Sequence, residues 1–235
     1  MTIFNSVYKS FEQWWQLGAN TVAYYPFNWD ILDHKSDYGV SGTDYDLTAV
    51  FWTPSYTTSF DSSKQAFNPQ ATNNTSWWCW LQNSNSVWNF SWDFTVSFCV
   101  KLNQSFNNYT SFITNRYRWD FRFMNSIDGN NKFFFHGSAQ YLTDTVLSVW
   151  TWYNITCTVL NWDYTIYIDW TAVKTGTYSY TSVNPSVLNI WFGYYDSSNY
   201  LERLNGCISE VIIDWEWWDA TKAMDRAIYL WFASA

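Results

Sequence analysis

Apolar and polar positions alternate along much of the chain with a period of two, the pattern of β-strands that bury one face. The segment 153–160 shows this most clearly, because every second residue from Tyr153 to Val159 is suited to a core. Clusters of Asn, Asp, Ser and Gly interrupt the alternation and indicate turns. The pattern predicts strands near residues 22–27, 47–52, 64–68, 93–102, 109–116, 119–125, 132–136, 152–160, 163–169, 171–178, 187–193 and 207–215.

Many short strands at this spacing are typical of an all-β sandwich or barrel. Helical character is confined to two segments of the chain. Residues 219–230 predict a short C-terminal helix, and residues 10–17 predict another that ends at Gly18. Since one all-β domain commonly reaches this length, we expect a lead-in or linker at residues 1–20 and a single domain at residues 21–235.

Tryptophan occupies turn positions at which glycine is expected. Asn161-Trp162 separates the strands expected at 153–160 and 163–169, and Asp169-Trp170 precedes the next strand. A two-residue type I′ hairpin needs positive φ at both central residues, which is why Asn-Gly and Asp-Gly are its usual sequences. Positive φ is unfavourable for a residue as bulky as tryptophan.

The composition shows the same anomaly. The chain has 19 Trp and only 8 Gly, whereas average usage would give roughly 16 Gly. One hypothesis is that many of these tryptophans are glycines in the native protein, encoded by UGA codons that the source organism reads as glycine. The alternative is a genuine tryptophan-rich surface, as in a sugar-binding protein. The genomic codons at positions 29, 92, 162 and 170 distinguish the two.

The net charge of −8 and the lack of a basic block argue against nucleic-acid binding, because phosphate neutralisation supplies most of that affinity. An acidic surface is compatible with a neutral glycan or with Ca²⁺. No stretch is long and apolar enough for direct membrane insertion. The first residues lack the uninterrupted apolar region of a signal peptide. We therefore expect an extracellular, cell-surface or phage-particle location, with any export signal elsewhere in a longer protein.

Cysteine spacing gives no sign of a zinc site, since no C-x-x-C pair occurs among positions 79, 99, 157 and 207. Cys157 shares its strand face with Ile155 and Val159, which predicts a small core residue. A disulfide is an alternative. A catalytic thiol is disfavoured, because only His34 and His136 could serve as its base.

Six segments in chain order carry a resemblance to a known family. They are Val22–Asn28, Ser91–Lys101, Trp150–Val159, Tyr164–Trp170, Asn189–Gly193 and Asn205–Ile213. Together they resemble successive strands of laminin G-like domains in the concanavalin A-like lectin/glucanase superfamily. The resemblance runs from about residue 21 to residue 231. It implies an all-β, two-sheet antiparallel jelly-roll sandwich with a short C-terminal helix, and it implies no particular ligand, because one fold hosts many functions.

The departures from the family pattern involve tryptophan. The family has glycine at the positions of Trp29, Trp92, Trp150, Trp162, Trp170 and Trp191. By contrast, the family has tryptophan at the position of Trp152, which is therefore expected to be a genuine core aromatic. The comparison therefore favours the recoding hypothesis for tryptophans in turns. It does not favour it for a tryptophan within a strand, such as Trp152.

The resemblance also implies a calcium site. Calcium-binding relatives often use the loop after the first strand together with an acidic residue of the last strand. In this chain those residues are Asp30, Asp33 and Glu210, with Asp37 and Asp44 in the same loop. Calcium takes six to eight oxygen ligands from carboxylates and carbonyl groups. The alternative is a solvated acidic loop without a metal.

Glu210, Asp214 and Glu216 share strand parity and resemble the acidic motif of glycosidases on this fold. A retaining glycosidase needs two carboxyl groups about 5 Å apart. The four-residue gap between Glu210 and Asp214 spans about 13 Å along a strand. We therefore expect no catalytic residues here, and a glycoside hydrolase stays an alternative only if the fold brings two carboxylates together.

Aromatic rings near loop ends are the candidates for sugar binding, because flat rings stack on the apolar faces of pyranoses. Tyr117, Trp119, Tyr194 and Tyr195 are the predicted ligand-binding residues. We expect a non-enzymatic recognition or adhesion module for a glycan or cell-surface ligand, within a larger surface, secreted or phage-tail protein. The alternative is a structural sandwich that packs in a surface or viral assembly without binding sugar.

Overall fold

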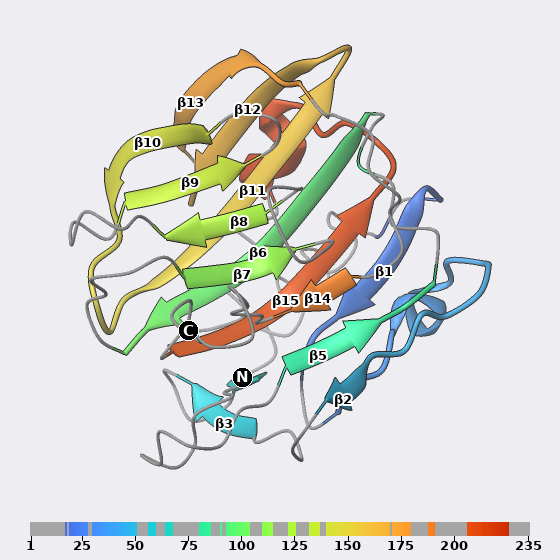
Figure 1. The fold of residues 1–235 in the computed structure, drawn as a ribbon. Coiled ribbons are helices and arrows are strands. Elements are labelled where there is room, and N and C mark those ends of the chain that lie inside the picture. Colours follow the sequence, from blue (N-terminus) through green and yellow to red (C-terminus); the bar gives the residue numbers. More distant parts are fainter. Residues whose placement is uncertain are drawn as a thin grey trace, which may run out of the picture.

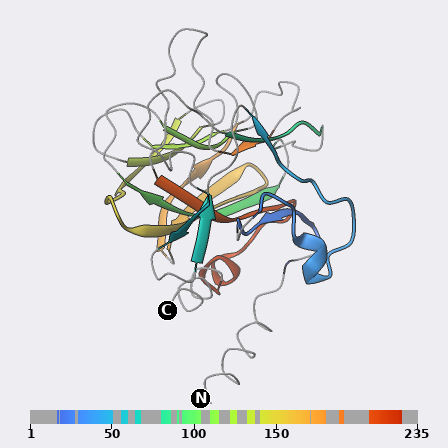
Figure 2. The same cartoon turned by 90° about the horizontal axis from the view of Figure 1, so that it is seen from below.

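Two antiparallel β-sheets pack face to face in the computed structural model (Figure 1). Seen from below, the sheets form two layers, and a short helix at 220–225 lies outside one of them (Figure 2). The predicted two-sheet antiparallel sandwich is confirmed. The structure describes residues 17, 19–27, 30–50, 56–59, 64–67, 80–85, 90, 93–103, 110–114, 122–125, 132–136, 140–169, 171–179, 188–190 and 206–225.

Sheet A has eight strands in the order β13-β12-β11-β6-β15-β4-β3, and β1 also pairs with β15. Its strands are β1 (Thr21–Tyr25), β3 (Tyr56–Ser59), β4 (Lys64–Phe67), β6 (Phe94–Leu102), β11 (Trp152–Leu160), β12 (Asp163–Ile168), β13 (Thr171–Thr177) and β15 (Gly206–Asp214). The sequence predicted these strands except β3, whose Tyr-Thr-Thr-Ser segment lacks apolar alternation.

Sheet B has seven strands in the order β10-β9-β8-β7-β14-β5-β2. They are β2 (Thr48–Val50), β5 (Trp80–Asn83), β7 (Thr110–Thr114), β8 (Arg122–Asn125), β9 (Lys132–His136), β10 (Gln140–Val146) and β14 (Leu188–Ile190). A 3-10 helix, η1 (Lys35–Tyr38), lies in the loop between β1 and β2. The strands β5 and β10 and the helix η1 were not predicted from the sequence.

The core between the sheets is rich in aromatic side chains. Phe98 of β6 packs against Phe112 of β7, with ring centroids 5.8 Å apart. Phe94 meets Phe135 of β9 edge to face at 6.4 Å. These four rings are fully buried. Phenylalanine rings bury large apolar areas, and edge-to-face pairs add to that stabilisation, so the alternating aromatic positions hold the two layers together.

The opposite face of sheet A is lined by small polar side chains. Ser97 and Thr156 share a hydrogen bond of 2.9 Å, and both are fully buried. Trp218, which precedes the helix at 220–225, donates its indole N–H to Asp214 at 3.0 Å. Asp219 caps this helix by accepting a hydrogen bond from the Lys222 backbone N–H. The first part of the predicted C-terminal helix is thus confirmed, while 226–230 lie outside the described residues.

The three cysteines that the structure describes, Cys99, Cys157 and Cys207, are all buried. Burial raises the pKa of Cys157 well above its ordinary value, and burial raises the pKa of Cys207 to about 11. A raised pKa favours the protonated thiol at neutral pH, which disfavours Cys157 and Cys207 as nucleophiles. The prediction that Cys157 is a core residue is confirmed, whereas Cys79 lies outside the described residues.

The backbone is sterically constrained at the start of β15 and in the hairpin between β11 and β12. Gly206 begins β15 so close to β6 that a Cβ atom would lie 2.1 Å from the Lys101 carbonyl oxygen, which excludes any other residue. The hairpin between β11 and β12 turns at Asn161 and Trp162, whose φ angles are 50° and 72°. Positive φ at both central residues is the mark of the expected type I′ turn.

The domain boundary at residue 20 stays a prediction. The carbonyl oxygen of Asn20 accepts a hydrogen bond of 3.1 Å from the Trp215 backbone N–H, and Leu17 packs against Trp218 and its neighbours. Residues 1–16 and 18 lie outside the described part of the chain. Within that described part, no helix is long and apolar enough to cross a membrane.

Candidate functional site

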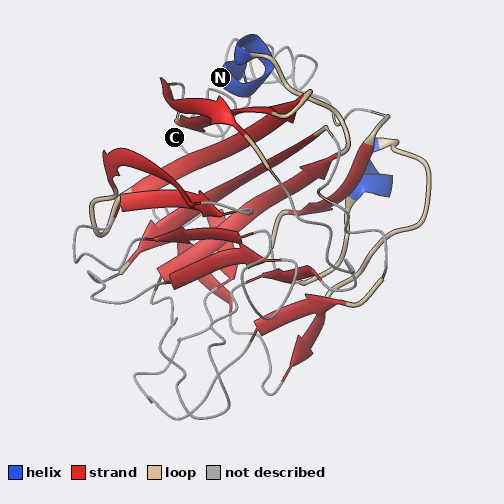
Figure 3. Ribbon diagram, turned by 45° about the horizontal axis from the view of Figure 1, so that its top comes forward, coloured by secondary structure: helices blue, strands red, loops and turns tan. Residues whose placement is uncertain are grey.

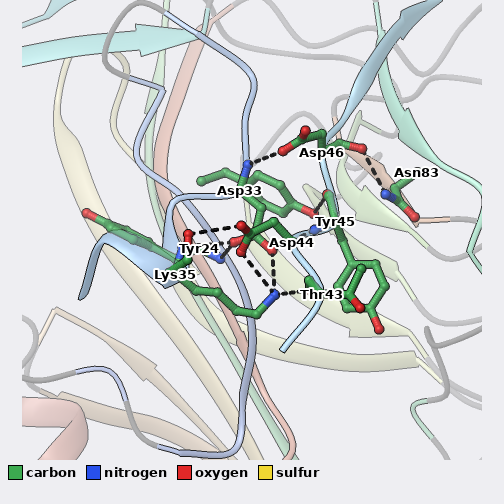
Figure 4. Close-up of polar contacts among 10 residues, drawn as sticks. Tyr24, Asp33, Lys35, Thr43, Asp44, Tyr45, Asp46 and Asn83 are labelled. Atoms are coloured by element: carbon green, nitrogen blue, oxygen red, sulfur yellow. Dashed lines mark hydrogen bonds and ion pairs between the residues drawn. The ribbon is translucent and has the colours of Figure 1, made fainter. Parts of the chain in front are cut away.

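The acidic loop between β1 and β2 is organised around the buried carboxylate of Asp33 (Figure 4). One oxygen accepts hydrogen bonds from the backbone N–H groups of Tyr24 (2.9 Å) and Lys35 (3.1 Å). The other accepts from the backbone N–H of Tyr45 (2.9 Å) and from the Lys35 ammonium (3.1 Å). These bonds join the end of β1 to both halves of the loop, so Asp33 fixes the loop's path.

The Lys35 ammonium lies inside the same loop, and its side chain is 3 % exposed. Besides Asp33 it contacts the Thr43 carbonyl oxygen and lies 3.5 Å from a carboxylate oxygen of Asp44. The ammonium also lies 4.9 Å from the centre of the Tyr45 ring. The lysine is therefore surrounded by the oxygen types that calcium prefers, and its own positive charge balances the buried carboxylate.

A glycine lets the loop turn back over this pair. Gly39 follows η1 in the left-handed conformation, with φ of 78°. Its backbone N–H donates to the Ser36 carbonyl oxygen at 3.0 Å, and the N–H of Val40 donates to the Lys35 carbonyl oxygen at 3.2 Å. Such a left-handed glycine ends a helical turn at little steric cost. The chain thereby reverses and brings residues 43–46 back over Lys35.

Asp30, the second predicted calcium ligand, is engaged by a histidine. The two ring nitrogens of His34 lie 2.8 Å from Asp30 and 2.7 Å from Asp37. Both nitrogens can donate only in the protonated ring. Burial lowers the pKa of His34, but the hydrogen bonds to Asp30 and Asp37 outweigh it, and the pKa is raised above its ordinary value. This arrangement favours the protonated, positively charged ring between two carboxylates.

Glu210, the third predicted ligand, lies where β15 bulges. The register between β15 and β6 shifts between Ser209 and Ile212, and Glu210 has φ of 56°. Its carboxylate accepts a hydrogen bond of 2.7 Å from the Tyr24 hydroxyl. Tyr24 thus contacts Glu210 through its hydroxyl and Asp33 through its backbone. Bulges and left-handed residues often occur near functional sites.

Each predicted calcium ligand has a partner within the protein. Asp30 pairs with His34, Asp33 pairs with Lys35, and Glu210 accepts from Tyr24. Among the described residues, no three His, Cys, Asp or Glu side chains are gathered in a way that could hold a metal ion. Calcium binding by this loop stays a prediction, and an ion at Asp33 has to compete with the Lys35 ammonium.

The acidic motif of β15 does not form an open catalytic pair. Asp214 is fully buried, and its carboxylate accepts from the Trp218 indole and lies 3.8 Å from the Lys222 ammonium. Burial raises the pKa of Asp214 above its ordinary value. Glu216 follows the strand and lies 3.6 Å from the same ammonium. In these positions Asp214 and Glu216 attach the helix at 220–225 to sheet A.

The four predicted sugar-binding aromatics, Tyr117, Trp119, Tyr194 and Tyr195, lie outside the described residues. In the sequence, Tyr117 and Trp119 come after β7, and Tyr194 and Tyr195 come after β14; β7 and β14 pair in sheet B. Exposed aromatic rings in the described part of the chain include Tyr38, Trp150, Trp162 and Trp217. The described residues therefore do not test the prediction that these four residues bind sugar.

A row of polar residues crosses all seven strands of sheet B, whose strands lie in front in Figure 1. The cross-strand register aligns their Cα atoms from one edge of the sheet to the other. The row runs through Gln140, His136, Arg122, Thr114, Asn189, Gln82 and Thr48. Sequence reasoning missed this row, because polar positions in separate strands become neighbours only when the register is known.

Core residues flank two of the row positions whose side chains the structure describes. Leu81 and Ile190, which lie beside Gln82 and Asn189, are fully buried in the core, and successive residues of a strand point to opposite faces. Thr48 is exposed and Gln82 is partly exposed, whereas Thr114 and Asn189 are buried. The side chains of Gln140, His136 and Arg122 lie outside the described part of the structure. Within the described part, the polar groups that this row offers to solvent are therefore those of Thr48 and Gln82.

The sequence matches no known protein family and no curated relative. The fold is similar to domain 4 of AbnA, an extracellular GH43 arabinanase from Geobacillus stearothermophilus whose structure contains arabinotriose. The two chains are 18 % identical with a TM-score of 0.67, and the match covers 88 % of this chain and 98 % of that domain.

Two larger proteins contain a similar fold. A structure of botulinum neurotoxin type C, whose cell entry depends on two ganglioside molecules, matches 90 % of this chain at 11 % identity and a TM-score of 0.65. Trypanosoma rangeli sialidase matches 91 % of this chain at 10 % identity and a TM-score of 0.61. The chain spans 51 % of the toxin chain and 33 % of the sialidase chain. At these identities the likeness establishes the β-sandwich fold.

Proposed function

We propose that this protein is a non-enzymatic recognition module that binds a glycan or a glycan-bearing cell surface. Its β-sandwich covers nearly the whole of an arabinanase domain that was solved with a bound oligosaccharide. A second similar structure belongs to a toxin that interacts with gangliosides. Both ligands are carbohydrates or carry them, and these similarities support the choice of ligand class.

The observation that carries the proposal is the polar row across sheet B. Sugars present hydroxyl groups at regular spacing, and amide and hydroxyl side chains can both donate to them and accept from them. Adjacent strands lie about 4.8 Å apart, so polar groups on two neighbouring strands can contact neighbouring hydroxyl groups of a sugar. Gln82 and Thr48 lie at the accessible end of this row.

The predicted aromatics complete the proposed surface. In the sequence, Tyr117 and Trp119 follow β7, and Tyr194 and Tyr195 follow β14; β7 and β14 are neighbouring strands of the row. A sugar ring that is hydrogen-bonded by a strand can also stack on an aromatic residue of a neighbouring loop. We place the protein outside the cell or on a phage particle, as one part of a larger protein.

The contacts of the acidic residues of β15 support a non-enzymatic role. A retaining glycosidase needs two carboxyl groups about 5 Å apart in a cleft that a sugar can enter. Asp214 is fully buried beneath Trp218, so a sugar cannot reach its carboxylate. The Glu210 carboxylate instead accepts from Tyr24.

The proposal is tested by binding assays with arabinan oligosaccharides, ganglioside headgroups and a wider glycan array, each with and without Ca²⁺. We expect the protein to bind at least one of these glycans. The double variant Thr48→Ala/Gln82→Ala should weaken that binding at least tenfold. The matched control is Thr171→Ala/Thr175→Ala on β13 of sheet A, where both threonines are exposed, and it should keep the original affinity.

Each failure has a separate meaning. A protein that binds no glycan under either condition contradicts the proposed function. Binding that both double variants weaken equally, or that neither weakens, contradicts the polar row as the site. Thermal melting of the variants shows whether a loss of binding reflects unfolding.

A further inference from the structure

Two exposed tryptophans adopt a backbone conformation that favours glycine. Trp150 has φ of 64° and Trp162 has φ of 72°. Trp150 lies just before β11, and Trp162 is the second central residue of the hairpin between β11 and β12. Positive φ is an outlier for a bulky residue, because the Cβ atom then crowds the backbone.

Side-chain packing gives little compensation for this conformation. Trp150 is 67 % exposed and Trp162 is 50 % exposed. The Trp162 ring stacks on Tyr178 with centroids 6.5 Å apart, the one ring contact found for it among the described residues. Strained residues persist when their surroundings hold them in place. Here the Trp150 N–H donates to the Leu102 carbonyl oxygen at 2.7 Å, and the Trp162 carbonyl oxygen accepts from the Tyr178 N–H at 2.5 Å. These bonds use the backbone alone, so a glycine at either position can form them equally well.

Other tryptophans of the same chain behave as the residue normally does. Trp218 is 1 % exposed, and its indole donates a hydrogen bond to Asp214. Trp152 lies within β11, partly buried, with the Lys101 ammonium 5.4 Å from its ring centre. Neither has positive φ. The structure thus separates core tryptophans from turn tryptophans.

The hairpin between β12 and β13 begins in a similar way. β12 ends at Ile168, Asp169 follows with φ of 55°, and β13 begins at Thr171. Asn-Gly and Asp-Gly are the usual sequences of a two-residue turn that begins with positive φ, whereas this chain has Asp-Trp. Because residue 170 lies outside the described residues, the case for Trp170 rests on the sequence.

We propose that Trp150, Trp162 and Trp170 stand at positions where the native protein has glycine. The codons UGG and UGA share their first two bases. If the amino-acid sequence is deduced with UGA read as tryptophan, it has tryptophan at every UGA codon. A cell with a glycine tRNA that decodes UGA inserts glycine at the same codons. This accounts together for the excess of Trp and the shortage of Gly in the chain. It does not depend on the proposed function.

The nucleotide sequence of the gene is the first test. We expect UGA at codons 150, 162 and 170, and UGG at codons 152 and 218. Mass spectrometry of the protein from its source should then find glycine in the peptides that contain the first three positions. UGG at codon 150 or 162, or tryptophan in those peptides, overturns the proposal.

Protein stability gives a second test that needs no source organism. The variant Trp150→Gly/Trp162→Gly should melt at a higher temperature than the protein with tryptophan, because the turns lose their strain. The matched controls Trp152→Gly and Trp218→Gly should melt at lower temperatures, because they remove packed side chains. A lower melting temperature for the double turn variant contradicts the proposal.

Discussion

The Lys35 ammonium lies 3.1 Å from a carboxylate oxygen of Asp33, and both side chains are almost completely shielded from solvent. Each charge is costly to bury alone. The carboxylate is further satisfied by backbone N–H groups of Tyr24 and Tyr45, and the ammonium by the Thr43 carbonyl oxygen. The pair and its hydrogen bonds together make this buried position tolerable, and each partner depends on the other.

Replacing Lys35 with methionine should destabilise the protein by about 3–5 kcal/mol, because it leaves the Asp33 carboxylate buried without a counter-charge. Chemical denaturation measures the change in the free energy of unfolding. The control is Lys132→Met, whose partner Asp144 is fully accessible, and which should cost about 0–1 kcal/mol. Adding Asp33→Asn to the first variant should recover part of the loss, and no recovery would show that charge burial is not its cause.

Calcium should bind more tightly after Lys35 is removed, since an ion at Asp33 and Asp44 no longer competes with the ammonium. Isothermal titration with CaCl2, with MgCl2 as the comparison, measures this for the original protein and for Lys35→Met. We expect at least a tenfold gain in calcium affinity in the variant. Equal affinities would show that calcium binds away from Lys35, and Glu210→Gln would then test the remaining predicted ligand.

The stability that His34 contributes should depend on pH. Its pKa is raised by Asp30 and Asp37 in the folded protein, so the folded state binds the proton more tightly than the unfolded state. The contribution is therefore fully present below the unfolded pKa near 6.5 and is lost as pH rises through the higher folded value. The difference in melting temperature between the original protein and His34→Gln should shrink as pH increases through the folded pKa of His34. A difference that is constant with pH contradicts the assignment.

Trp218→Phe should destabilise the protein by about 1–3 kcal/mol, because the buried Asp214 carboxylate loses the indole N–H that donates to it. Thermal or chemical denaturation measures the loss. Trp217 lies beside it in the sequence and is 39 % exposed, so Trp217→Phe is the matched control and should change stability by less than about 0.5 kcal/mol. Similar losses in both variants would indicate that ring size, rather than the hydrogen bond, is responsible.

The sequence predicts the strands whose alternation is regular and buried on one side. β6 and β11 are of this kind, with Phe94, Phe98 and Ile155 fully buried in the core. β3 was missed because its polar residues carry no periodic signal. The bulge at Glu210 was also missed, since a register shift depends on the partner strand.

The candidate site was predictable only in part. The acidic loop could be found from its aspartates, but the burial of Lys35 could not, because a lysine is usually exposed. Its position depends on residues 43–46 folding back over it, which is a property of the whole loop. The polar row of sheet B likewise depends on the pairing of seven strands that are distant in sequence.

The pairing of β1 with β15 has a consequence for how the protein is made. Thr21 lies opposite Asp214 in that pair, so sheet A is complete only after nearly all of the domain has been synthesised. Contacts between such distant residues slow folding. The hairpins of β11, β12 and β13 can form earlier, because they join neighbouring segments. A nascent chain that stops before β15 should therefore leave one edge of β6 unpaired and need protection by chaperones until the last strand arrives.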